Sequence, residues 1–226
     1  MKHHMSVFEK ETDLIKALID IHLEGNDIDA DFTFFKGNFY KDGINTPKTC
    51  YDIKPQFDWV IKQDNSVYCL GEKYEDKFKS VMIDPPFMIA NRPSQRKFYS
   101  SGTHGYYESF EDLENSYIGF LRNAYIRLDR KGICLFKCQD FTDSKTILTH
   151  AYVWKWAEEN GFYVKDLAIL NKEKGKVYNS KTKQRHLRKS HTYFFVLEKK
   201  RKKPYWYKEL ENNFNQQYQP DTITNE

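Results

Sequence analysis

The turn at Asp84, Pro85, Pro86 and Phe87 limits what this chain can fold into more than any other stretch. It follows the β-prone run 78–83, so a strand ends there. Each proline fixes φ near about −65° and lacks an N–H, which makes the turn rigid and leaves carbonyls free to accept hydrogen bonds. A carboxylate, a carbonyl and an aromatic face at the end of a buried strand can hold a planar ring and its amino group. The turn therefore predicts a ligand such as a nucleobase.

Strand and helix patterns alternate along the rest of the chain. Apolar residues at helical spacing predict helices at 7–24, 108–128 and 143–160, with a short helix at 57–61. Runs rich in β-branched and aromatic residues predict strands at 30–35, 49–53, 66–70, 78–83, 133–136, 162–170 and 192–197. This alternation predicts an α/β fold with a mainly parallel sheet. No helical pattern separates the last two strands, so we expect them to form an antiparallel pair at one edge.

The composition indicates one soluble domain. The chain has 226 residues, 30% of them charged, and a mean hydropathy of −0.80, and this length suits one sizeable core. It contains no apolar run near the roughly 20 residues of a membrane span and no signal-peptide pattern. We therefore expect a cytoplasmic protein without membrane contact. No C-x-x-C pair suggests a zinc or redox site, and reduced thiols are expected at Cys50, Cys69, Cys134 and Cys138.

Positive charge is concentrated near the carboxyl end, although the net charge is only +4. The segment 171–191, between the last two predicted strands, carries eight lysines and arginines against one acidic residue, Glu173. A second basic cluster fills 199–203, and a polar tail that we expect to be weakly structured follows it. Such clusters favour contacts with a phosphate backbone. A solvated hairpin tip is the alternative interpretation of 171–191.

Four stretches in colinear order carry a family resemblance: residues 36–40, residues 51–56, the Asp-Pro-Pro-Phe turn and residues 136–140. Together they resemble the S-adenosylmethionine-dependent amino-methyltransferases of nucleic acid. The resemblance is strongest to small phage and bacterial DNA adenine methyltransferases that lack a separate recognition domain. It implies a Rossmann-like methyltransferase fold, α/β, with a seven-stranded mainly parallel sheet and an antiparallel edge pair. The catalytic domain would span 30–198, after an N-terminal helix and leader at 1–29 and before a basic, then polar, tail at 199–226.

The resemblance assigns the chemistry to the turn and the cofactor to the ends of the neighbouring strands. Asp84, Pro85, Pro86 and Phe87 would be catalytic. The cofactor S-adenosylmethionine would be bound by Phe35, Gly37, Asn38, Asp52, Glu72 and Asp84. Asp52 is the candidate partner of the ribose hydroxyls, because a carboxylate accepts both hydroxyl hydrogens. An ordinary turn at Gly37 and a solvated loop edge at Asp52 stay open, as does the choice between Asp64 and Glu72 for the adenine amine.

Three segments are candidates for contact with nucleic acid. The segment 88–109 is a predicted mobile loop that can close over a flipped base, or else a plain surface loop. Lys137 and Gln139 follow a buried strand and either contact the target nucleotide or cap that strand. The hairpin 171–191 is the third segment. The residues that we assign to nucleic-acid binding are Arg92, Arg96, Lys97, Tyr99, Lys137, Gln139, Lys183, Arg185, Arg188 and Lys189.

The predicted activity is methyl transfer from S-adenosylmethionine to the exocyclic amino group of adenine in DNA, by a monomer or homodimer and without a metal. Two alternatives stay open. One is an amino-methyltransferase that acts on RNA or on a protein amide, since both present similar N–H donors. The other is a non-catalytic nucleic-acid-binding relic, because the F-x-G-x-G pattern common in methyltransferases is absent.

Overall fold

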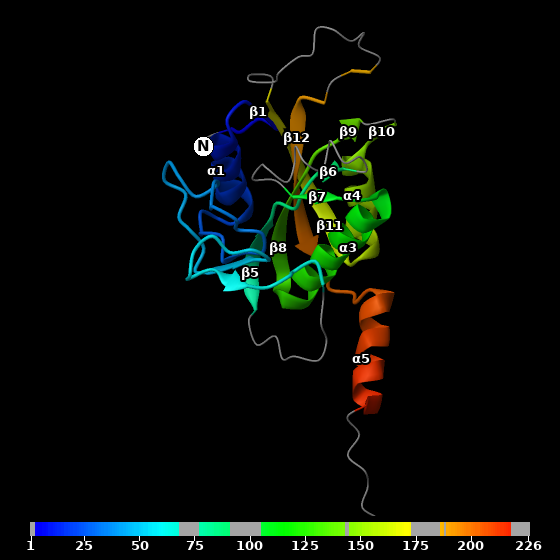
Figure 1. Cartoon of the computed structure of the whole chain (residues 1–226). Coiled ribbons are helices and arrows are strands. Elements are labelled where there is room, and N and C mark those ends of the chain that lie inside the picture. Colours follow the sequence, from blue (N-terminus) through cyan, green and yellow to red (C-terminus); the bar gives the residue numbers. More distant parts are fainter. Residues whose placement is uncertain are drawn as a thin grey trace, which may run out of the picture.

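A computed structural model describes residues 3–67, 77–90, 105–142, 145–172, 186–187 and 189–217 (Figure 1). Within these residues, eight strands form one sheet in the order β1-β11-β12-β8-β5-β2-β3-β4. The strands of this sheet are β1 (Val7–Phe8), β2 (Ala30–Asp31), β3 (Thr49–Asp52), β4 (Ile61–Lys62), β5 (Phe78–Ile83), β8 (Leu128–Cys138), β11 (Phe162–Asn171) and β12 (His191–Lys199). The helices are α1 (Glu11–His22), α3 (Phe110–Arg127), α4 (Thr149–Glu159) and α5 (Tyr205–Gln217).

The strand directions confirm the predicted mainly parallel sheet with an antiparallel pair. β4, β3, β2, β5 and β8 run parallel to one another, whereas β12 is antiparallel to both of its neighbours, β8 and β11. The pair β11 and β12 is not quite the edge, because β1 adds an eighth, two-residue strand parallel to β11. The predicted helix at 7–24 therefore begins later, at Glu11, after this short strand.

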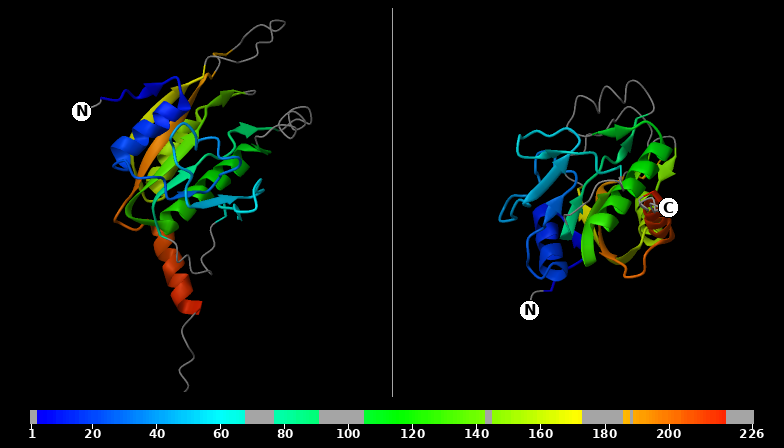
Figure 2. Two further views of the ribbon diagram at one scale, coloured as in Figure 1. Left: turned by 90° about the vertical axis from the view of Figure 1, so that its left-hand side faces the viewer. Right: turned by 90° about the horizontal axis from the view of Figure 1, so that it is seen from below.

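Helices cover both faces of the sheet (Figure 2). On one face, α3 and α4 bury Leu113, Tyr117 and Val153 against side chains such as Phe136. On the other face, α1 packs Leu14 and other apolar residues against the opposite side of the same strands. Successive strand side chains point to opposite faces, and both faces of this sheet are covered. The apolar runs 81–83 in β5 and 133–136 in β8 are therefore continuous instead of alternating with polar residues.

Some elements differ from the predictions. β4 at Ile61–Lys62 pairs with β3, where the sequence predicted a short helix at 57–61. A strand of two residues, such as β4, is too short to show the alternation of apolar and polar residues that predicts a strand. Of the strand predicted at 66–70, residues 68–70 lie outside the described residues. The expected helix at 143–160 begins at Thr149, because the hairpin β9 (Phe141–Thr142) and β10 (Thr146–Ile147) precedes it.

The two predicted irregular segments contain ordered parts. The ends of the loop 88–109 pair as β6 (Met88–Ile89) and β7 (Tyr106–Tyr107), and residues 91–104 lie outside the described residues. The tail forms α5, which extends away from the sheet (Figure 1). Trp206 and Tyr207 anchor its first turn, with ring centroids 5.7 and 5.5 Å from that of Tyr125. Among the described helices, none combines the length and the apolar character that a membrane crossing requires.

A buried arginine joins α3 to the strands beneath it. The Arg127 guanidinium lies 4.4 Å from the ring centroid of Tyr51 and 5.0 Å from that of Phe32. Asn123, one turn earlier, donates a hydrogen bond of 2.9 Å to Asn65 Oδ1. The loop after β4 is thereby held against the helix, which places the ends of β2, β3 and β5 relative to α3.

Gly119 allows this close approach, and its replacement provides a test of the packing. A Cβ at position 119 would lie 1.6 Å from the backbone oxygen of Ser66. Gly→Ala within a helix normally stabilises it by about 0.5–1 kcal/mol. For Gly119→Ala we expect the opposite sign, a loss of about 1–3 kcal/mol in the free energy of unfolding measured with urea. Asn115→Ala, at an exposed position of the same helix, is the matched control and should not destabilise the protein. A stabilised Gly119→Ala variant would contradict this packing.

Candidate active site

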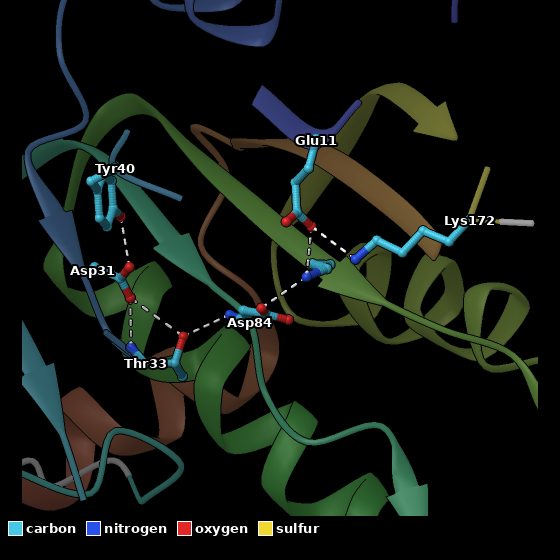
Figure 3. A network of polar contacts seen from close by, with 7 residues as sticks. Glu11, Asp31, Thr33, Tyr40, Asp84 and Lys172 are labelled. Atoms are coloured by element: carbon cyan, nitrogen blue, oxygen red, sulfur yellow. Dashed lines mark hydrogen bonds and ion pairs between the residues drawn. The ribbon is translucent and has the colours of Figure 1, made fainter. Parts of the chain in front are cut away.

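The carboxyl ends of β2, β5 and β8 meet at one edge of the sheet. Met82 pairs with Asp31 on one side and with Leu135 on the other, so the three strands end nearly level. The residues that follow, Asp84 after β5 and Lys137 near the end of β8, therefore come together although they are 53 positions apart. Figure 3 shows the polar network at this edge.

Asp84 is held from two sides. Its backbone N–H donates to Thr33 Oγ1 at 2.7 Å, and its Oδ2 accepts from Lys137 Nζ at 2.9 Å. Its Oδ1 is buried, and no hydrogen bond reaches it from the described residues. Burial raises the pKa of Asp84, and the neighbouring Lys137 opposes this rise. Asp84 thus keeps one carboxylate oxygen available to accept a hydrogen bond from a ligand.

The rest of the turn is fixed against α3. The Pro86 carbonyl accepts a hydrogen bond of 3.0 Å from the Tyr117 hydroxyl. The sequence predicted that this carbonyl would be free to accept from a ligand, and this contact occupies it. The Pro85 carbonyl is then the candidate second acceptor beside Asp84. The Phe87 ring is partly buried, with its centroid 5.5 Å from Lys137 Nζ.

Asp31, at the end of β2, is a site residue that the sequence analysis missed. Its Oδ2 accepts from the Tyr40 hydroxyl at 2.6 Å, and its Oδ1 accepts from the Thr33 N–H at 2.8 Å. Burial raises the pKa of Asp31 to about 7, and the nearby Asp84 adds to the rise. Thr33 links the Asp31 carboxyl group to the backbone N–H of Asp84, as Figure 3 shows. The strand predicted at 30–35 put Asp31 near its beginning, whereas β2 ends at Asp31, so no pattern in the sequence pointed to a site there.

The predicted cofactor residues of the first two strands form one unit. The Phe35 N–H donates to Asp52 Oδ2 at 2.9 Å, and the Lys54 N–H donates to Asp52 Oδ1 at 2.7 Å. Asp52 is only 9% exposed, so it is not a solvated loop edge. Gly37 has φ +66°, and a Cβ there would meet the Phe34 ring, so the turn itself requires glycine. Asn38 is exposed beside it.

A cavity of about 520 Å³ opens directly after Asp52. Its lining includes Ile53, Lys54, Pro55, Phe57, Val60 and Lys62. Asp64, one candidate for the adenine amine, instead accepts hydrogen bonds from the N–H and hydroxyl of Ser66, at 2.9 and 2.6 Å. Glu72, the other candidate, lies outside the described residues.

Lys137 lies inside the protein beside Asp84 and the Phe87 ring, and its predicted contact with the target nucleotide stays a prediction. It is only 5% exposed, and its ammonium group lies between Asp84 and Glu11, 3.0 Å from Glu11 Oε1. A buried ammonium paired in this way is not available to a phosphate on the surface. Gln139 is partly buried just beyond it, and Asp140 follows, accepting from the ring of His150.

Most of the predicted nucleic-acid contacts fall outside the described residues, and they stay predictions. These are Arg92, Arg96, Lys97 and Tyr99 in the loop, and Lys183, Arg185 and Arg188 in the hairpin. Lys189 is described and lies, partly buried, two residues before β12. The part of the chain that the structure describes contains no group of three or more His, Cys, Asp or Glu arranged to hold a metal ion.

Comparison with known families now identifies the chain. The model of a family described as DNA methylase matches residues 78–225, which include the Asp-Pro-Pro-Phe turn. The chain belongs to this family. The match extends from β5 to the polar tail, so it includes the Asp-Pro-Pro-Phe turn, α3, β8, α4 and the antiparallel pair. No curated protein sequence matches the chain.

Several solved methyltransferase structures are similar to this DNA methylase family member. TrmN from Thermus thermophilus has 18% identity and a TM-score of 0.47, over 82% of this chain and 48% of its own. An S-adenosylmethionine-dependent methyltransferase from Clostridium acetobutylicum has 9% identity and a TM-score of 0.45, over 85% and 92%. The N-methyltransferase NodS from Bradyrhizobium japonicum, in complex with S-adenosyl-L-homocysteine, has 8% identity and a TM-score of 0.43, over 84% and 85%. The chain spans about half the length of TrmN.

The residues at this edge fit S-adenosylmethionine, the cofactor of the methyltransferases that the chain resembles. A buried acid at the tip of the second strand, beside an open cavity, suits a ribose and an attached base. Asp31 and Asp84 lie closer to the centre of the sheet, where a positively charged sulfonium would be favoured by nearby carboxylates.

The raised pKa of Asp31 predicts a pH dependence of stability. The folded state holds the Asp31 proton up to a pH of about 7, whereas the unfolded chain releases it near 3.8. Folding therefore takes up a proton between these values, and the free energy of unfolding falls as the pH rises through this window. Asp31→Asn has no titrating group at this position, so its free energy of unfolding should lack this fall. Between pH 4 and pH 7, the stability of the wild type should therefore decrease more than that of the variant. Urea titrations at four or more pH values measure it. Asp58→Asn, at an exposed site, is the control and should run parallel to wild type.

Proposed function

We propose that this protein transfers the methyl group of S-adenosylmethionine to the exocyclic amino group of adenine in DNA. One observation carries the proposal. In a member of the DNA methylase family, the turn after β5 presents a carboxylate with one oxygen held and the other, Oδ1, buried and without a hydrogen bond from the described residues. An acceptor in that state suits an N–H donor, and an exocyclic amine is such a donor.

The chemistry follows from this arrangement. The lone pair of an exocyclic amine is delocalised into the ring, which makes the nitrogen a poor nucleophile. Two acceptors, Asp84 Oδ1 and the Pro85 carbonyl, would each bind one N–H and favour a pyramidal nitrogen with its lone pair directed at the methyl carbon. The cofactor supplies that methyl group on a sulfonium. Orientation and electrostatics then lower the barrier without a covalent enzyme intermediate.

The protein supports both acceptors and the ring that faces the base. Tyr117 holds the Pro86 carbonyl, so the turn keeps its shape when a ligand binds at Asp84 and Pro85. The Phe87 ring would stack on the extruded base, which must leave the duplex to reach the turn. The loop 88–109 begins and ends beside this turn, since Gly105 packs against Pro86 and β6 pairs with β7. Its arginines and tyrosines are our candidates for contacts with the flanking strand.

Replacement of the acceptor tests the proposed reaction. For Asp84→Ala we expect methyl transfer to fall by at least about 100-fold, because an acceptor that acts in the transition state is lost. Binding of S-adenosylmethionine, measured by calorimetry, should persist. The assay follows tritiated methyl groups into separate DNA, RNA and protein fractions. Glu159→Ala, on the exposed face of α4, is the control for the loss of an exposed carboxylate. Full activity in Asp84→Ala would end the assignment, and transfer into RNA or protein alone would redirect it. A wild type that binds no cofactor would indicate a relic.

Replacement of the ring tests base stacking. One stacked base contributes about 1–3 kcal/mol, so Phe87→Ala should raise the KM for DNA by about 10-fold or more. Phe87→Tyr keeps an aromatic face and should stay near wild type. Steady-state kinetics with DNA oligonucleotides measure both. Equal kinetics for Phe87→Ala and wild type would remove the stacking role while leaving the role of Asp84 intact.

A further inference from the structure

Glu11 and Lys137 reach the catalytic turn from opposite parts of the chain. Glu11 is the first residue of α1, and Lys137 lies near the end of β8. The Lys137 ammonium is 2.9 Å from Asp84 Oδ2 and 3.0 Å from Glu11 Oε1. Lys172 reaches the same Glu11 oxygen at 3.4 Å from the exposed side of the network, as Figure 3 shows. We propose that Lys137 is the positioning residue for the Asp84 carboxylate, and that Glu11 is the positioning residue for Lys137. This inference rests on the proposed function.

The position of Lys137 leaves its ammonium few alternatives. Its side chain is 6% exposed. Its Nζ lies 4.7, 5.5 and 5.5 Å from the ring centroids of Phe39, Phe87 and Phe194. Aromatic faces attract a cation but offer no acceptor oxygen, so the two carboxylates direct the N–H bonds. Because Oδ2 of Asp84 is held in this way, Oδ1 has a defined direction. The same ammonium lies over the ring that we assign to base stacking.

The network also controls the charge of Asp84. An ionised carboxylate accepts an N–H, whereas a protonated one offers its own O–H and would oppose an amine. Burial acts against the ionised form, and Glu11 adds to this effect through its negative charge. Lys137 is the nearest positive group, with Lys172 farther away. Burial lowers the pKa of Lys137, but Asp84 and Glu11 outweigh it and raise that pKa, so the ammonium stays charged.

The other titratable groups near Asp84 stay neutral. These are Tyr40 after β2, Tyr117 on α3 and Cys138 on β8. Burial raises the pKa of each of them well above its ordinary value. The ionisation of Asp84 in the working pH range is therefore set by burial and Glu11 on one side and by Lys137 and Lys172 on the other.

Two substitutions should move the pKa of Asp84 in opposite directions. Lys137→Met removes the cation and keeps the apolar stem, so the pKa of Asp84 should rise by about 1–3 pH units. Glu11→Gln keeps an oxygen that accepts from Lys137 but removes a negative charge, so the pKa of Asp84 should fall. A general loosening of the fold cannot produce shifts of opposite sign. Carbon-13 NMR of labelled aspartate carboxyls measures the titration, and Asp84→Asn identifies the Asp84 signal.

The pH profile of methyl transfer gives the matching functional readout. The acidic limb of kcat should move to higher pH in Lys137→Met and to lower pH in Glu11→Gln. Lys165→Met is the matched control, because Lys165 forms a lysine–carboxylate pair of 2.8 Å with Glu198 away from the turn. Its Asp84 titration and its kcat profile should both match wild type.

The outcomes separate this inference from the proposed function. An Asp84 titration that does not move in Lys137→Met, or that moves the same way in both variants, overturns the positioning role even when the wild type methylates DNA. Opposite shifts in a protein that methylates no nucleic acid uphold the network and overturn the proposed function. If Lys137→Met fails to fold, Glu11→Gln alone decides, because an unchanged or raised pKa of Asp84 in that variant contradicts the inference.

Discussion

The parallel pairing of β5 with β2 and β8 is the constraint on which the rest of the structure depends. Parallel strands present their carboxyl ends at one edge, and the register here ends all three nearly level. Asp31, Asp84 and Lys137 thereby become neighbours without any sequence proximity. The turn after β5 is then tied to both layers of helices, to α3 through Tyr117 and to α1 through Lys137 and Glu11. A shift of either layer would therefore reach the Asp84 carboxylate.

The two carboxyl groups at this edge, the buried Asp31 and the partly buried Asp84, have different electrostatic environments. Taking a charge out of water costs several kcal/mol unless a partner compensates it. Asp84 has the Lys137 ammonium as a partner, whereas Asp31 is bound by the neutral donors Thr33 and Tyr40. Burial therefore raises the pKa of Asp31 to about 7. A proton kept on Asp31 reduces repulsion between the two acids, and it leaves Asp84 as the carboxylate that suits an N–H donor.

Much of the fold and part of the site could be predicted from the sequence. β5 spans the predicted residues, because a β-prone run that ends in Val81, Met82 and Ile83 and is followed by Asp84 and two prolines admits few other structures. α3 follows its helical spacing and begins at a capping box of Ser109 and Asp112. In contrast, β1 and β4 are two-residue strands that depend on their neighbours, and the start of α5 depends on contacts with Tyr125. Periodicity carries no signal for such elements.

The sequence by itself determined the order of the elements, the rigid Asp-Pro-Pro-Phe turn and the class of ligand that the turn suits, because these depend on local backbone preferences and on residue chemistry. Only the tertiary structure decided which groups act on the turn. It bound Pro86 to Tyr117, buried Lys137 between Asp84 and Glu11, and brought Asp31 within reach of Asp84 through Thr33. These contacts join residues that lie far apart in the chain, and burial, which sets their charges, exists only once the sheet has formed.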